Sequence, residues 1–174
     1  IFKKFNFDLI EVFPQITHGG SMRYVVAREN EYEISKNVKI YEENEIKEKI
    51  HNFEGLKSFK EKCTLSKEKI INQLEQFKKQ GKKVSGYAAT SKSTTILNFC
   101  GINDNLIDCI YDTTPDKIGK YSPGMHIPIK DYKEFDRNYP DIVYLFAWNH
   151  KKEIFNKEKE YIEGGGKWFS HVEL

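Results

Sequence analysis

The chain has 174 residues, of which 39% are hydrophobic and 14% aromatic, values that are ordinary for one soluble globular domain with an attached arm. Its 28 lysines and arginines nearly balance 26 acidic residues and form no basic stripe with interleaved aromatics, which argues against nucleic-acid binding. No apolar run is long enough to cross a bilayer, no signal peptide is visible, and the three cysteines lack metal-ligand spacing, so we expect a cytoplasmic protein with no membrane contact and no metal site.

Residues 1–40 are predicted to form linking strands around one polar loop. Apolar and polar residues alternate from Phe5 to Val12, with one slip at Ile10, which is typical of a half-buried strand. Residues 22–27 predict a second strand. The loop between the two strands is therefore held at both of its ends.

Residues 41–81 are predicted to form a helical arm of two helices, at 41–50 and 66–80. In the second helix, Ser66 is a candidate N-cap, apolar residues recur on one face, and Gly81 ends the helix. Two helices in series before the next strand favour an arm that packs against another domain.

Residues 82–174 change to an alternation of strands and helices. These elements are predicted at 84–88, 91–99, 108–111, 141–147, 150–163 and 167–172. The third strand is apolar throughout, as expected for a strand buried on both faces of a parallel sheet. We therefore predict an α/β fold: a Rossmann-like three-layer domain with a mostly parallel sheet, whose ligands bind at the carboxyl ends of the strands.

The loop between the first two strands carries the most reactive group of side chains, His18-Gly19-Gly20-Ser21-Met22-Arg23. Histidine is the side chain that titrates nearest neutrality, so a positioned imidazole can take a proton at working pH. The double glycine lets the backbone approach a ligand closely, and Ser21 and Arg23 add a hydroxyl and a guanidinium. No carboxylate partner for His18 is evident, and a purely structural histidine is the alternative.

A second group lies in the turn after the strand at 84–88, which reads Gly86-Tyr87-Ala88-Ala89-Thr90-Ser91-Lys92. Free N–H groups at the start of the next helix, together with Lys92, could bind a diphosphate, although plain capping by Thr90 or Ser91 explains the turn equally well. Asp112 lies near the offset of the ribose-binding acid in dinucleotide-binding folds, but a single glycine does not make that fingerprint.

The Pro/Gly-rich loop at 113–128 carries polar side chains that could line a pocket or lie on its rim without a ligand. These are Lys117, Lys120, Tyr121 and His126. After the third strand of this domain, Trp148 could stack on a base or sugar or fill the core, and Asn149 could bind a ligand or cap the next helix. His51 and His171 have no chemical neighbours in the sequence and are interpreted as surface or core residues.

Five motifs follow one another along the chain. They are His18-Gly-Gly-Ser-Met-Arg, Gly86-Tyr-Ala-Ala-x-x-Lys92, Asp112-x-x-Pro-x-Lys117-x-Gly, Pro123-Gly-x-His126-Ile-Pro and Trp148-Asn149. In this order they resemble the C-terminal part of the S-adenosylmethionine-dependent C-methyltransferases that act on nucleotide-linked keto-deoxysugars. The resemblance covers the chain from the His18 loop onward, and five ordered motifs are far more specific than any one of them.

The resemblance implies an enzyme of three parts, in which a zinc module and a domain that binds S-adenosylmethionine precede this piece. Neither is present, since the sequence holds no cysteine cluster and no glycine-rich donor motif. Because it begins at Ile1 and not at methionine, we expect a domain cut from a longer chain. The expected partners are a nucleotide-diphosphate sugar and the missing donor domain of the same polypeptide, and this chain alone is not expected to methylate anything.

The implied reaction removes a proton from the carbon next to a sugar ketone, and the resulting enolate takes the methyl group. We assign the base to His18, with Arg23 supporting its loop or meeting substrate charge and Lys92 meeting the diphosphate. The candidate substrate-binding residues are Ser21, Arg23, Tyr87, Lys92, Lys117, Tyr121, Trp148 and Asn149. Two departures from the family pattern are Ala88, where many relatives carry glycine, and Thr17, which cannot ionise beside His18.

Two other classes of function compete with this interpretation. One is a non-catalytic nucleotide-binding or scaffolding module whose arm docks another domain. The other is a nicotinamide-dependent reductase domain, which the missing glycines disfavour.

Overall fold

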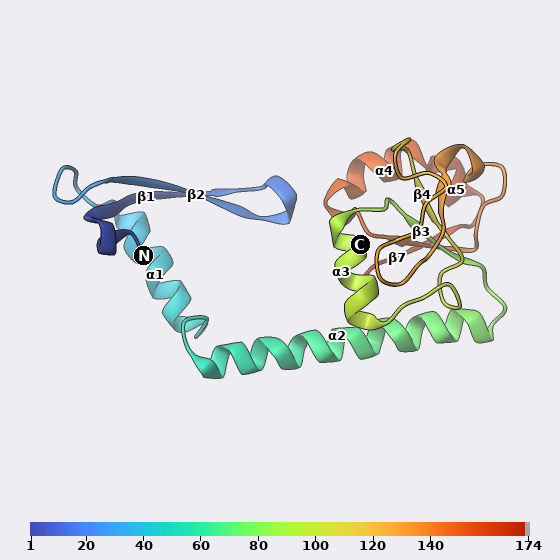
Figure 1. Cartoon of the computed structure of the whole chain (residues 1–174), viewed down its shortest axis with the longest axis horizontal. Coiled ribbons are helices and arrows are strands. Elements are labelled where there is room, and N and C mark those ends of the chain that lie inside the picture. Colours follow the sequence, from blue (N-terminus) through green and yellow to red (C-terminus); the bar gives the residue numbers. More distant parts are fainter. Residues whose placement is uncertain (173–174) are drawn as a thin grey trace. The chain divides into compact units, whose positions relative to one another are not determined.

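The computed structural model describes residues 1–172 and separates the chain into two compact units, which meet between residues 62 and 63 (Figure 1). This boundary falls within the long helix α2 (Phe53–Lys79). Among the described residues, no helix combines the length and the apolar character that crossing a membrane requires.

The first unit is built on an antiparallel strand pair, β1 (Phe7–Gln15) and β2 (Ser21–Arg28). The pairing register shifts between Leu9 and Glu11, so the slip expected at Ile10 is confirmed as an irregularity of the β-bulge kind, in which one extra residue faces the partner strand. Both predicted strands are therefore present. β1 begins two residues later than predicted, because Phe5 ends a 3-10 helix, and it continues three residues beyond Val12, whereas β2 is one residue longer at each end.

Helix α1 (Lys36–Lys47) contacts β1 and begins five residues before the predicted start at residue 41. The reason is a cap that apolar periodicity does not indicate: the Ser35 hydroxyl accepts a hydrogen bond from the Asn37 N–H at 3.1 Å. The position of the first turn is thus set by a side chain rather than by apolar periodicity.

Helix α2 also begins early, and the expectation that Ser66 caps it was wrong. The Asn52 side chain accepts from the N–H of Gly55 at 3.0 Å, and Ser66 lies in the helix interior. No proline lies between Asn52 and Ser66, so nothing interrupts the helical hydrogen bonds there. The apolar face that the sequence indicates is confirmed, because Ile70 and Leu74 are buried.

The second unit contains a five-stranded sheet in which every neighbouring pair is parallel. In sheet order the strands are β5 (Ile129–Asp131), β4 (Ile110–Asp112), β3 (Val84–Tyr87), β6 (Ile142–Leu145) and β7 (Lys167–Phe169). Numbered within this unit, the order is 3-2-1-4-5, that of the Rossmann fold, which confirms the predicted fold class. Strand β5 was not predicted, because three residues at a sheet edge are too few to show an alternating pattern.

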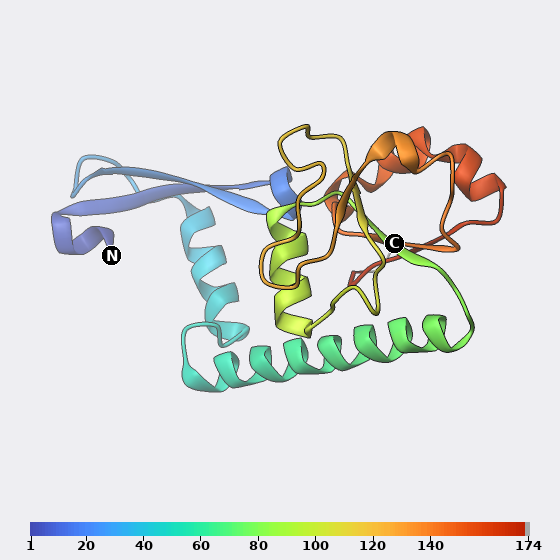
Figure 2. The same ribbon diagram turned by 45° about the vertical axis from the view of Figure 1, so that its right-hand side comes forward.

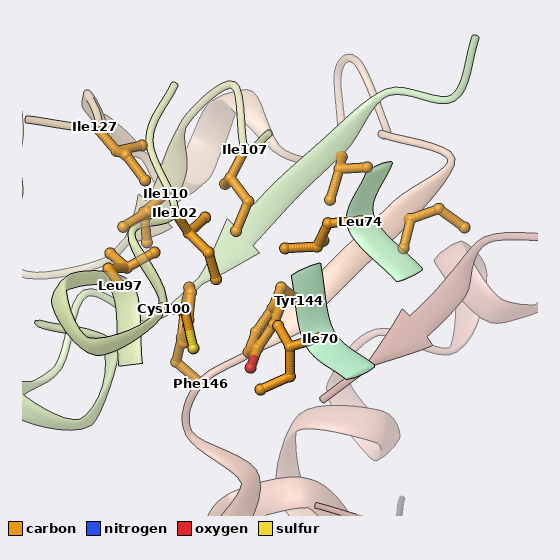
Figure 3. Close-up of a cluster of buried hydrophobic side chains, with 12 residues drawn as sticks. Ile70, Leu74, Leu97, Cys100, Ile102, Ile107, Ile110, Ile127, Tyr144 and Phe146 are labelled. Atoms are coloured by element: carbon orange, nitrogen blue, oxygen red, sulfur yellow. The ribbon is translucent and has the colours of Figure 1, made fainter. Parts of the chain in front are cut away.

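Strand side chains alternate between two hydrophobic clusters, one on each face of the sheet. In β6, Tyr144 belongs to the first cluster and Leu145 to the second. Helices α2 and α3 (Ser91–Cys100) supply the first cluster, where side chains of both helices gather around Tyr144 (Figure 3). Helices α4 (Lys151–Lys157) and α5 (Lys159–Glu163) supply the second, so the three-layer arrangement is confirmed.

The segment 150–163 was predicted as one helix but is broken at Glu158, between α4 and α5. The backbone of Glu158 is not helical (φ −101°, ψ 36°), and the residue is only 3% exposed. Its carboxylate accepts hydrogen bonds from the hydroxyls of Tyr87 and Tyr132, both at 2.7 Å. A buried carboxylate needs such partners, so a tertiary contact accounts for the break.

Gly86 lies within β3 and not in the turn after it. A Cβ at this position would come within 2.7 Å of Cε2 of Phe146 and 3.0 Å of Cγ1 of Ile110. We therefore expect Gly86→Ala to lower the free energy of unfolding by about 2 kcal/mol, because two buried side chains must shift to admit a methyl group. Denaturant unfolding of both proteins measures the difference, and an unchanged midpoint contradicts this packing.

Candidate functional site

The strand order reverses between β3 and β6, which are neighbours in the sheet but are separated in the chain by β4 and β5. In doubly wound sheets of this type, ligands bind in the crevice outside the carboxyl ends of the strands at this reversal. The turn from β3 into α3 and the segment from Ala147 to Asn149 leave the sheet at this edge. A ligand site is therefore expected at this edge.

A cavity of about 290 Å³ lies between the start of α3 and the loop that follows β4. Its lining consists of Ala89, Thr90, Ser91, Ser93, Thr94, Asp116, Lys117, Lys120, Tyr121, Ser122, Pro123 and Ile129. The loop at 113–128 runs beside α3 in both views (Figures 1 and 2), and Nδ2 of Asn98 donates to the carbonyl of Pro123 at 2.9 Å. This bond holds the two walls of the cavity together, and the volume suits a small ligand.

The start of α3 combines a capped N–H with uncapped ones. The Thr90 hydroxyl accepts from the N–H of Ser93 at 3.2 Å, so the expected cap is confirmed. Within residues 1–172, the N–H groups of Ser91 and Lys92 have no hydrogen-bond partner, and they lie at the positive end of the helix dipole. Ala88, just before this turn, has φ 70°, a left-handed conformation that favours glycine.

Asp112 ties the turn after β3 to the loop after β4. Its carboxylate accepts from the N–H groups of Ala89 and Thr114, both at 2.7 Å, and from Nζ of Lys117 at 3.3 Å. Burial raises the pKa of Asp112, but the hydrogen bonds from Thr114 and Ala89 and the charge of Lys117 outweigh burial, and its pKa lies below the ordinary value. The Asp112 carboxylate is buried and already bound by three protein donors, so it joins these two loops and is not presented to a ribose.

The ammonium of Lys117 is also occupied. Besides its contact with Asp112, it donates to the carbonyl of Ala89 at 2.8 Å. Lys117 does line the cavity, as predicted, but its charge is already balanced. Tyr121 lines the cavity as well, is 63% exposed, and has its backbone bridged to Pro128.

Lys92, Trp148 and Asn149 form a separate group across the strand-order reversal. Nζ of Lys92 donates to Oδ1 of Asn149 at 2.6 Å and lies 5.4 Å from the centre of the Trp148 ring. The expectation that Asn149 caps the following helix was wrong, because α4 begins after His150 without a side-chain cap and the Asn149 amide is turned to Lys92. None of the three residues lines the cavity.

Tyr87 lies in the second hydrophobic cluster and is 8% exposed. Its hydroxyl donates to Oε1 of Glu158, and burial together with this carboxylate raises the pKa of Tyr87 far above its ordinary value. The structure thus gives its polar atom a protein partner, and Tyr87 is left out of the candidate site.

His171 does have chemical neighbours, contrary to the interpretation from sequence. Its Nδ1 lies 3.2 Å from the Tyr144 hydroxyl. Burial and then the charge of Lys92 lower its pKa. No sequence signal predicts these contacts, because they join His171 to residues of β6 and α3 that are distant in the chain. The cavity residue Asp116 was likewise missed, since its only signal is its place in a long loop.

His18, in the loop between β1 and β2, and Ser21 and Arg23, at the start of β2, are exposed on the surface of the first unit. His18 has φ 55° within a short 3-10 turn, and the Ser21 hydroxyl donates to the carbonyl of Thr17 at 3.2 Å. The guanidinium of Arg23 lies 4.6 Å from the centre of the Phe13 ring, which favours the loop-supporting role among the two considered for it. His18 is exposed, and within residues 1–172 its imidazole makes no hydrogen bond.

The described residues do not fit S-adenosylmethionine. The turn after β3 has Ala88 and Ala89 where a cofactor would need close approach of the backbone, and the acid at the end of β4 is buried and bound by three protein donors. The part of the chain that the structure describes also brings together no cluster of three metal-ligating side chains.

Residues 16–172 match the protein family described as C-methyltransferase C-terminal domain. Over 88 residues the chain is 41% identical to the C-methyltransferase NovU of Streptomyces niveus. The matched stretch covers 51% of this chain and 21% of that protein, so the chain spans about a fifth of the length of this curated relative.

Proposed function

The chain belongs to the C-methyltransferase C-terminal domain family, and from this premise we propose that it is the substrate-binding, C-terminal part of an S-adenosylmethionine-dependent methyltransferase that acts on a nucleotide-linked keto-deoxysugar. The methyl donor supplies the one-carbon group and is held by another domain of the complete protein, since the residues described above do not fit it. By itself this chain binds substrate and does not methylate. Its three cysteines are free thiols, which accords with a cytoplasmic enzyme.

One observation carries the substrate class: the cavity at the carboxyl edge of the Rossmann sheet. It joins Ser91, whose N–H at the start of α3 is unpaired within residues 1–172, to polar side chains of the facing loop and to the exposed ring of Tyr121. A helix start favours an anionic group such as a diphosphate, and an exposed aromatic ring offers a face to a nucleobase. A nucleotide-diphosphate sugar has both parts.

We assign the chemistry of deprotonation to His18. Its imidazole takes the proton from the carbon next to the sugar ketone, and the electron pair of the broken C–H bond forms an enolate. The methyl donor, held by another domain, would supply the methyl group to the enolate carbon, and its sulfur would keep the electron pair of the broken C–S bond. The support for this role is an exposed imidazole without a protein partner, in a loop with two glycines of positive φ.

Calorimetric titration of the chain tests the substrate class. We expect a deoxythymidine diphosphate-sugar to bind and a nicotinamide dinucleotide not to bind, because the turn after β3 lacks the glycines of the dinucleotide fingerprint and Asp112 is buried. Binding of the nicotinamide dinucleotide without binding of the sugar nucleotide contradicts the proposal and favours a reductase domain.

A further inference from the structure

We propose that Lys120, and not Lys92, is the cation that meets the diphosphate, and that Lys92 instead holds Trp148 and Asn149 in place. The inference rests on the proposed function, since it assumes a nucleotide-linked substrate. It differs from the sequence-based expectation, which gave the diphosphate to Lys92.

Three lysines lie near the start of α3, and two of them are engaged. Lys92 donates to Asn149 at 2.6 Å and lies over the Trp148 ring, so it joins α3 to the segment after β6. Lys117 contacts the carboxylate of Asp112 and the carbonyl of Ala89. Moving either ammonium to a phosphate breaks contacts that hold the edge of the sheet together.

Lys120 is exposed and lines the cavity, and within residues 1–172 its ammonium has no partner. Its backbone, in contrast, is fixed on both sides. The Lys120 N–H donates to the carbonyl of Lys117 at 3.1 Å, and its own carbonyl accepts from the N–H of Ile129, the first residue of β5, at 2.8 Å. A free ammonium on an anchored backbone is suited to binding an anion, because little main-chain order is lost on binding.

The charges that line the cavity also support a role of Lys120 in binding the diphosphate. The charged residues of the lining are Asp116, Lys117 and Lys120, and Lys117 is neutralised by Asp112. What remains is one negative charge on Asp116 and one positive charge on Lys120. Replacing Lys120 by a neutral residue leaves Asp116 to repel a phosphate.

The test is calorimetric titration of the chain with deoxythymidine diphosphate, on the wild type and on Lys120→Gln, Lys92→Gln and Lys130→Gln. Lys130 is a matched control, an exposed lysine of β5 outside the cavity lining. We expect Lys120→Gln to raise Kd about tenfold or more, as for loss of a charged hydrogen bond, and to weaken the salt dependence of binding. We expect less than a threefold change for the other two variants.

The outcomes separate this inference from the function on which it rests. If the wild type binds and Lys120→Gln binds equally well, the role of Lys120 is wrong while the substrate class stands. A tenfold loss in Lys92→Gln overturns the division of roles between the two lysines. If the wild-type chain does not bind deoxythymidine diphosphate, the proposed substrate site falls together with the inference.

Discussion

His18→Asn in the complete methyltransferase is expected to slow methyl transfer at least about a hundredfold, because a general base contributes a factor of roughly this size or more. Asparagine suits the test, since it tolerates the left-handed backbone of His18 (φ 55°) while removing the titrating ring. The side chain is exposed, so the stability of the protein changes by no more than about 0.5 kcal/mol. A steady-state assay of methyl transfer measures the effect.

The matched control is His51→Asn, an exposed histidine in the connection between α1 and α2. We expect the His51→Asn variant to transfer methyl groups at the wild-type rate, because only His18 acts as the base. A wild-type rate for His18→Asn would show that the base is another residue. A loss caused by unfolding is detected by a shift of the melting temperature.

Asp112→Asn is expected to lower the free energy of unfolding of the second unit by about 3 kcal/mol at neutral pH. The Asp112 side chain is 6% exposed, and its two oxygens accept from Ala89, Thr114 and Lys117. An amide has only one oxygen, so one N–H loses its acceptor and Lys117 loses its counter-charge. Denaturant unfolding followed by tryptophan fluorescence reports on this unit, because Trp148 and Trp168 both lie in it.

The effect of Asp112→Asn depends on pH in a fixed direction. The folded pKa of Asp112 lies below that of the unfolded chain, about 3.9. Its contribution is therefore complete above about pH 4 and is lost as the pH falls through the folded value, so the difference between the two proteins narrows in acid. Asp116→Asn is the control, since Asp116 is exposed and makes none of these bonds. Equal stability of wild type and Asp112→Asn at pH 7 refutes the assigned role of Asp112.

Local patterns were sufficient to predict most of the elements. The apolar run at 141–147 gave β6, the Thr90 cap gave the start of α3, and the slip at Ile10 is a real irregularity of β1. They failed where the deciding partner is distant. Glu158 breaks a helix because two tyrosine hydroxyls bind its carboxylate, and β5 exists only as an edge strand beside β4.

In the candidate site, too, some features could be predicted from local sequence patterns and others depend on distant contacts. The Rossmann-like fold and the family could be predicted from the five ordered motifs and the strand spacing, because these are local or sequential properties. Which of the three lysines has no partner depends instead on tertiary contacts. The sequence does not distinguish the three cations Lys92, Lys117 and Lys120. In the structure Lys92 donates to Asn149 and Lys117 to Asp112, whereas Lys120 lines the cavity without a partner among residues 1–172. Whether a lysine ammonium is available to a ligand depends on the side chains that lie next to it in space. The tertiary fold places those side chains.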